Sequence, residues 1–179
     1  MDEDPLQSDA YHRTLLECLP RSWPKHATIE AQYATQTAEL LVAVIIQSNW
    51  QIQLIVVQSV NAILQKSATM PTSGITPLLE PIINLGPRTK SSGLKREILK
   101  FIRIALAIDR YAQCFDEQEH LREVLKFNID EMIHDTRSNE ISEQAKELKK
   151  QHEHLFRQTK KRDEHIETIN VDPTENNLF

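Results

Sequence analysis

WQIQLIVVQSVNAILQKSA, residues 50–68, runs for about 18 residues without a turn signal. Its many β-branched residues would suit a strand, but the run is longer than a typical strand. Wound as a helix, it carries two apolar stripes, Trp50/Leu54/Val57/Leu64 and Ile52/Val56/Val60/Ile63. A helix that is apolar on two sides must be covered on both sides, so the sequence predicts a helix buried between neighbours.

Apolar residues at helical spacing continue on either side of this run. They predict further helices at residues 8–19, 28–48, 75–85, 94–112, 117–135 and 138–162. We expect Ser8 or Asp9 to cap the first helix and Pro20 to end it. Pro81 is expected to kink or end the short helix at 75–85. The chain has only 3 glycines, which argues against a fold rich in tight β-turns.

Two more caps are expected in the second half of the chain. Asp116 should cap the helix at 117–135, and Ser138 should begin the last helix. The tail, residues 163–179, is polar and is predicted to be disordered, which leaves 1–162 as the folded domain.

A repeat links the deciding run to a later helix at an offset of about 44 residues. Leu54, Ile55, Val57, Val60 and Leu64 match Ile98, Leu99, Phe101, Ile104 and Ile108. HEAT and armadillo units have this period, so the predicted fold is an all-α, HEAT/armadillo-like solenoid of about three antiparallel helix pairs. An unrelated helical bundle is the alternative.

The two ends of this predicted stack differ. The last helix is charged on its outer side, as a terminal cap should be, whereas the first helix has no partner before it and exposes the Leu15/Leu16 end. The chain therefore reads as the C-terminal end of a longer array. If the native chain is this short, we expect the first helix to promote self-association.

Composition and charge limit the classes of partner and the cellular compartment that we expect. A net charge of −5 does not suit a nucleic-acid binder. The start of the chain is acidic, unlike a signal peptide, and the longest apolar run, residues 40–46, is far below the roughly 20 residues of a membrane span. We expect a protein of cytoplasm and nucleus, without membrane insertion, whose cysteines, Cys18 and Cys114, are reduced and mostly buried.

Candidate sites are few. His152 and His154 are two residues apart and so point to different helix faces, which does not suit a metal site, and no nucleotide or nucleophile motif occurs. We therefore expect no cofactor, no metal and no enzymatic activity. Trp23 and Trp50 are candidate interface anchors, although core packing at helix junctions is favoured. Lys149 and Lys150 could complement a helix end or meet an acidic partner.

Two segments carry a resemblance to a known family. LECLPRSWP (residues 16–24) and SNWQIQLIVVQSVNA (residues 48–62) resemble the C-terminal region of the proteasome adapter and scaffold family, and the charged helix at 140–150 is similar in character to that family's terminal helix. The resemblance spans roughly residues 12–150. It implies a large, non-enzymatic HEAT-repeat protein that binds the proteasome core and regulatory particles in cytoplasm and nucleus and is found peripherally at endoplasmic reticulum or endosomes.

A trafficking or nuclear-transport adaptor of importin or adaptin type is the alternative, and an enzyme regulatory domain is a third possibility. An importin-like protein would carry an inner ladder of Asn and Trp at the repeat spacing. Asn61 fits such a ladder, but Ala105 stands at the matching place in the next unit.

Overall fold

The computed structural model describes residues 5–67 and 69–157, with side chains from residue 10 onward. The described residues form helices and no strand, so the all-α prediction is confirmed. The helices are α1 (Pro5–Ser22), α2 (Ala27–Gln47), α3 (Trp50–Lys66), α4 (Thr72–Ile83), α5 (Leu85–Arg88), α6 (Ser92–Ala107), α7 (Asp109–Glu117), α8 (Glu119–Ile133), α9 (Asn139–Gln151) and α10 (Glu153–Phe156). The predicted tail at 163–179 lies outside the described residues.

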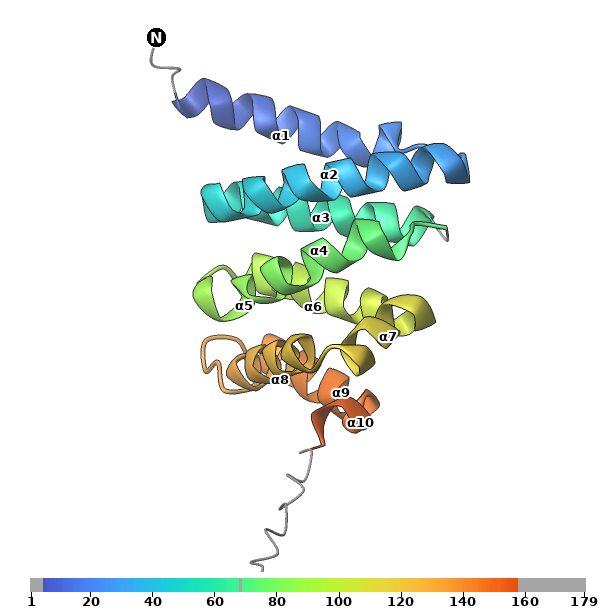
Figure 1. Cartoon of the computed structure of the whole chain (residues 1–179). Helices are drawn as coiled ribbons and strands as arrows, with labels where there is room; N and C mark the ends of the chain where they lie inside the picture. Colours follow the sequence, from blue (N-terminus) through green and yellow to red (C-terminus); the bar gives the residue numbers. More distant parts are fainter. Residues whose placement is uncertain (1–4, 68, 158–179) are drawn as a thin grey trace, which may run out of the picture.

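The long helices stack in two layers from one end of the chain to the other (Figure 1). In one layer α1 packs on α3, α3 on α6 and α6 on α9; in the other α2 packs on α4 and α4 on α8. Hence α3, α4 and α6 are each covered on two sides by helices about 40 residues away in the sequence. The core runs through the whole stack as a single apolar cluster.

Helix α3 occupies the buried position that its two apolar stripes predict. Asn49 caps it by accepting hydrogen bonds from the backbone nitrogens of Gln51 and Ile52, at 3.0 and 3.2 Å. The stripe of Ile52, Val56, Val60 and Ile63 is fully buried between α1 and α6. The second stripe is buried at Val57 and Leu64 only, because Trp50 at the start of the helix is 48% exposed.

Helix α1 does not end at Pro20, as predicted, but continues through it to Ser22 and also begins earlier, at Pro5, so Ser8 and Asp9 lie inside the helix. A proline in a helix cannot donate to the carbonyl four residues earlier, here that of Leu16. The hydroxyl of Ser59 on α3 donates to this carbonyl instead, at 2.7 Å. A donor from the neighbouring helix thus replaces the missing N–H.

Helix α4 contains both Pro77 and Pro81, so Pro81 does not end it, and the helix ends at Ile83, two residues before the predicted end. It begins at Thr72, three residues before the predicted start, and crosses α2 at close range. A Cβ placed on Gly74 would lie 2.7 Å from the Cβ of Ala34, so only glycine fits this crossing without movement. The contact with α2 holds the whole of α4 in place despite its prolines.

The helix predicted at 94–112 is divided into α6 and α7 by Ile108, whose backbone is extended. Tyr111 explains the division, since its buried hydroxyl donates to the carbonyl of Met70 at 2.6 Å and turns α7 toward the loop before α4. Asp116 consequently lies within α7 and is not the predicted cap of the next helix, which begins at Glu119.

The cap predicted at Ser138 is confirmed, because its hydroxyl accepts from the backbone nitrogen of Ile141. That helix ends at Gln151 and not near Arg162, and α10 follows it. The cysteines are both free, but Cys18 is exposed and only Cys114 is buried, so the prediction of burial is wrong for Cys18.

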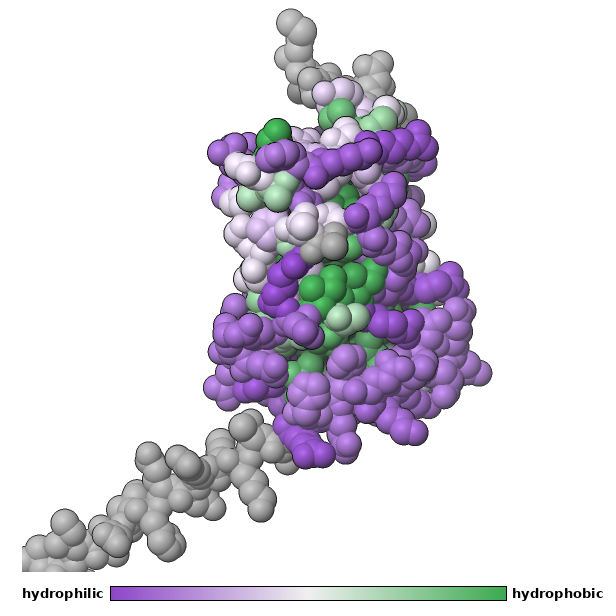
Figure 2. Space-filling view, turned by 90° about the vertical axis from the view of Figure 1, so that its right-hand side faces the viewer, coloured by the Kyte–Doolittle hydropathy of each residue, from purple (hydrophilic) through white to green (hydrophobic). Residues whose placement is uncertain are grey.

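Charged side chains gather in the C-terminal part of the stack. Figure 2 shows one side of the molecule, where strongly hydrophilic residues cover most of the lower part and paler residues are common nearer the top. Ion pairs join α6 to α9 (Arg96 with Glu140), α6 to the loop after α8 (Lys95 with Asp135), and α9 to α8 (Lys149 with Asp130). The two ends therefore offer different surfaces to a partner.

Candidate interaction surfaces

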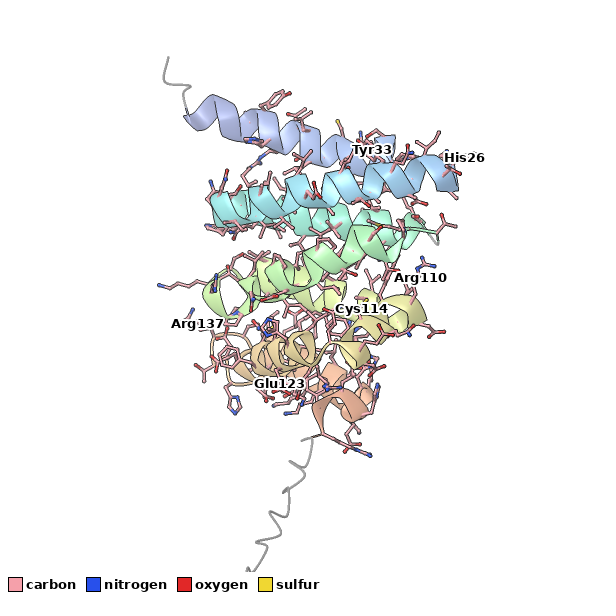
Figure 3. The ribbon with its side chains drawn as sticks, in the orientation of Figure 1. His26, Tyr33, Arg110, Cys114, Glu123 and Arg137 are labelled. Carbon is pink, nitrogen blue, oxygen red and sulfur yellow. The ribbon has the colours of Figure 1, made fainter. Side chains whose placement is uncertain are left out.

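Trp23 is placed as a packing residue at the start of α2. Its ring is half-buried and meets the ring of Tyr33 edge to face, with 5.3 Å between the ring centres. Figure 3 shows Tyr33 on α2 close to the end of α1. The indole nitrogen of Trp23 donates to Glu30 at 2.8 Å. Both contacts lie within the fold, which supports core packing over an interface anchor for this residue.

Glu30 joins the three segments around Trp23. Its carboxylate is 1% exposed and accepts hydrogen bonds from Trp23, from the hydroxyl of Ser67, and from that of Thr69 at 2.5 Å. Burial alone raises the pKa of Glu30, but these three donors and the charge of Arg110 hold that pKa below its usual value. Glu30 thus fixes the loop after α1 to the loop after α3.

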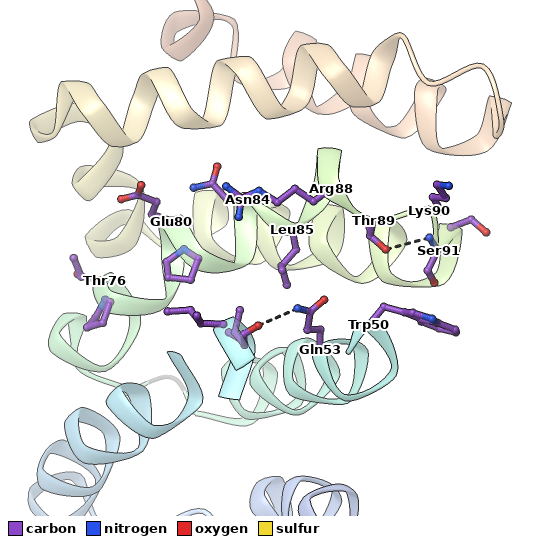
Figure 4. A pocket seen from close by; sticks show the side chains of 15 residues that line it. Trp50, Gln53, Thr76, Glu80, Asn84, Leu85, Arg88, Thr89, Lys90 and Ser91 are labelled. Atoms are coloured by element: carbon purple, nitrogen blue, oxygen red, sulfur yellow. Dashed lines mark hydrogen bonds between the residues drawn. The ribbon is translucent and has the colours of Figure 1, made fainter. Parts of the chain in front are cut away.

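Trp50 lines a groove of about 1120 Å³. The groove runs between the junction of α2 with α3 and the segment from α4 to the start of α6 (Figure 4). We define the Trp50 groove by Ile46, Trp50, Pro81, Arg88 and Lys90. Ile46 is 72% and Trp50 48% exposed, so an apolar wall is open to a partner.

The polar residues of the Trp50 groove are mostly engaged in hydrogen bonds within the fold, and its basic residues are exposed. The side-chain nitrogen of Gln53 donates to the carbonyls of Ile45 and Ser48, at 2.9 and 3.0 Å, and so ties α3 to the end of α2. On the opposite wall the exposed side chains of Arg88 and Lys90 reach solvent. The volume exceeds the range of most small-molecule pockets, which favours a segment of a protein.

Lys149 and Lys150, the basic pair of the last long helix, have different surroundings. Lys149 pairs with Asp130 of α8 at 2.6 Å and stands 5.9 Å from the centre of the Phe156 ring, so it joins helices within the stack. Lys150 is exposed. The structure does not bring these lysines together with either tryptophan, because the lysines lie on α9, whereas Trp23 precedes α2 and Trp50 begins α3.

Sequence reasoning missed Glu30, Ile46, Arg88 and Lys90. No local pattern marks them, because Glu30 meets partners 37 and 39 residues away and the groove forms only when α3 lies beside the segment after α4. Within residues 5–67 and 69–157, no group of three or more His, Cys, Asp or Glu side chains could hold a metal ion. None of the helices described is long and apolar enough to cross a membrane.

Comparison of the chain with protein-family models, with curated proteins and with solved structures found no match. The resemblance to the proteasome adapter and scaffold family therefore rests on residues 16–24, residues 48–62 and the charged helix at 140–150.

Proposed function

We propose that this chain is a non-enzymatic adapter built as a HEAT-type solenoid, and that it binds the proteasome. The observation that carries the first part is the spacing of contacts between helices. Side-chain hydrogen bonds join Thr35 to Ser73, Glu80 to His120, and Asn84 to Asn128, with separations of 38, 40 and 44 residues. A stack whose layers recur at this interval is expected of HEAT units.

Binding by contact is favoured by the surfaces that the described residues present. The Trp50 groove offers a half-exposed tryptophan beside an exposed isoleucine, and tryptophan is the residue type most enriched among binding hot spots. The proteasome is proposed as the partner because residues 16–24 and 48–62 resemble the proteasome adapter and scaffold family. The second of these segments includes Trp50. We therefore place the proteasome-facing surface at the Trp50 groove.

The residue that fitted the importin-like alternative, Asn61, does not face a partner. Asn61 is fully buried, and its side-chain nitrogen donates to the backbone carbonyl and the carboxylate of Glu97 on α6, at 3.0 and 2.9 Å. An asparagine committed to the neighbouring helix is not available to the backbone of a cargo peptide. We do not pursue that function.

The test is direct binding to purified proteasome particles. The immobilised chain is incubated separately with core particles and with regulatory particles, and bound subunits are identified by mass spectrometry. We expect capture of one particle type by the wild-type chain. The double variant Ile46→Glu/Trp50→Ser should lose most of this capture, because it places a charge and removes the aromatic anchor in the groove.

The matched control is Phe127→Glu, which makes the same apolar-to-acidic change at a 63% exposed residue of α8, away from the groove. It should bind like the wild type. Absence of capture of both particles would reject the proteasome as partner, whereas equal loss in the control would reject the Trp50 groove as the surface.

A further inference from the structure

The side of α2 that points away from α4 carries large apolar side chains, and none of the residues that the structure describes covers it. Ala34 lies against Gly74 of α4, and the hydroxyl of Thr35 is 3.1 Å from that of Ser73, so these contacts mark the side that faces α4. At 3.6 residues per turn, Ile29 and Leu40 fall on the opposite side of the helix. There they are 57% and 68% exposed.

Other large apolar side chains are exposed on the same end of the stack. Tyr33 shares the side of Ile29, and α1 adds Tyr11 and Leu15, one turn apart. We define the open face as Tyr11, Leu15, Ile29, Tyr33 and Leu40. A hollow of about 570 Å³ lies along α2 at this face, bordered by the uncharged Gln32 and Gln36. Soluble proteins that expose such a surface commonly use it for binding.

The opposite end of the stack cannot serve as the partner of this face. Helix α8 has Lys126 paired with Glu123, and Asp130 paired with Lys149 of α9. Covering these ion pairs with apolar side chains would remove their water without new partners, which is costly. A head-to-tail contact between copies is therefore unfavourable. If the open faces of two copies meet instead, apolar side chains pack against apolar side chains.

The size of the open face matches a small interface between two copies. Its five side chains each expose on the order of 100 Å², which gives about 500 Å² per copy and about 1,000 Å² when two copies meet. Specific interfaces begin at about that size, so a reversible, concentration-dependent dimer is the expected result. Few charges interrupt the face: Glu39 is the exposed carboxylate of α2.

We propose that the open face is an interface between two copies of this chain, related by a two-fold axis. In such an interface the same surface is used by both partners, so no complementary patch elsewhere is needed. The sequence had suggested self-association through the first helix; the geometry moves most of the interface to α2, because Leu16 is buried and Leu15 is not.

Sedimentation equilibrium of the full chain tests this proposal from about 1 to about 200 μM, a range in which a weak dimer changes its population. The mass should rise from 20.7 kDa toward twice that value. Ile29→Glu and Leu40→Glu should each raise the dissociation constant by about tenfold or more, because each buries a carboxylate in the dimer. Both residues are exposed in the single copy, so circular dichroism should show an unchanged fold.

Two controls make the outcome decisive. Phe127→Glu should dimerise like the wild type. The groove variant Ile46→Glu/Trp50→Ser should also dimerise like the wild type, so a failure of proteasome binding and a failure of dimerisation can be told apart. A chain that stays at 20.7 kDa throughout the range overturns the proposal and leaves the face for a helix of another protein. Dissociation caused equally by Phe127→Glu, or a mass that climbs past two copies, also overturns it.

Discussion

The two halves of the stack share one architecture but differ sharply in charge. From residue 27 to residue 79 the charged residues are Glu30, Glu39 and Lys66, whereas 25 of the 66 residues from 92 to 157 are charged. The early helices meet through small and apolar side chains and through hydrogen bonds to buried acceptors. The later helices meet through an apolar core and also through ion pairs between neighbouring segments of the stack.

This difference shows that helix stacking can be secured in two ways within one chain. In the first half, a few buried polar contacts join segments that have few charged residues. Loss of any one of these contacts should therefore strongly lower the free energy of unfolding. In the second half, many partly exposed ion pairs share the task, and each is screened by water. Single substitutions should therefore be more damaging in the first half.

Glu30→Gln should give the largest loss. The amide keeps the shape of the side chain but loses its charge and replaces one acceptor oxygen with an NH2 group, so the strong hydrogen bonds that Trp23, Ser67 and Thr69 donate to a charged carboxylate are weakened or lost. We expect a decrease in the free energy of unfolding of about 3 kcal/mol. Chemical denaturation followed by circular dichroism measures it.

Glu39→Gln on the same helix is the control, and it should change little because Glu39 is exposed. Acidity provides a second check. The pKa of Glu30 is lower in the folded chain than its ordinary value of 4.5, so the carboxylate stabilises the fold above that value and this contribution is lost as the pH falls through the lowered pKa. A wild-type advantage over Glu30→Gln that persisted at the lowest pH would contradict this role.

Ser59→Ala should cost about 2 kcal/mol, because it leaves the carbonyl of Leu16 buried without a donor. The cost should depend on Pro20. In a Pro20→Ala background the restored N–H reaches the same carbonyl, so there Ser59→Ala should cost much less. Denaturation of all four chains gives the coupling energy. An equal cost in both backgrounds would mean that Ser59 does not stand in for the missing N–H.

Pro20 also illustrates what the sequence could and could not predict. The spacing of apolar residues located α2, α3 and α6 closely, because each has an apolar side that must be buried. The effect of a proline depends on whether another donor reaches the freed carbonyl. That donor, Ser59, stands on another helix, so local rules wrongly ended α1 at Pro20.

The surfaces were harder to predict than the helices. Trp23 and Trp50 are alike in the sequence, since both stand at helix junctions. Yet the first is bound to Glu30 and the second faces a groove. Burial at a junction depends on which later segment packs there. For the same reason the sequence did not show that Ile29, Tyr33 and Leu40 are exposed in the folded chain.

Asp135→Asn probes the most enclosed ion pair of the second half. The side chains of Lys95 and Asp135 are 8% and 11% exposed, and Asp135 also accepts from the backbone nitrogen of Arg137 at 3.1 Å. Removal of the carboxylate leaves Lys95 without its partner, but the ammonium is near enough to the surface to recover some water. We expect a loss of about 1.5 kcal/mol in denaturation, less than for a deeply buried pair.

Glu140→Gln is the matched control. It breaks the exposed ion pair between Glu140 and Arg96, and Arg96 directly follows Lys95 on α6. It should have a clearly smaller effect than Asp135→Asn. If the two variants were equally damaging, enclosure would not be what distinguishes these pairs.

Added salt should produce the smallest effect and should separate the two halves without any substitution. Raising the salt from about 0.05 to about 1 M shortens the screening length from more than 10 Å to about 3 Å. Exposed pairs such as Arg96–Glu140 and Lys146–Glu143 should weaken, so the amides of α9 should exchange with deuterium a few times faster. The amides of α2 have no comparable exposed pair to lose, because the carboxylate of Glu30 is buried and is held by hydrogen bonds from uncharged groups. Hydrogen exchange with mass spectrometry compares the two helices in one sample, and an equal change in both would mean that charge does not divide the stack.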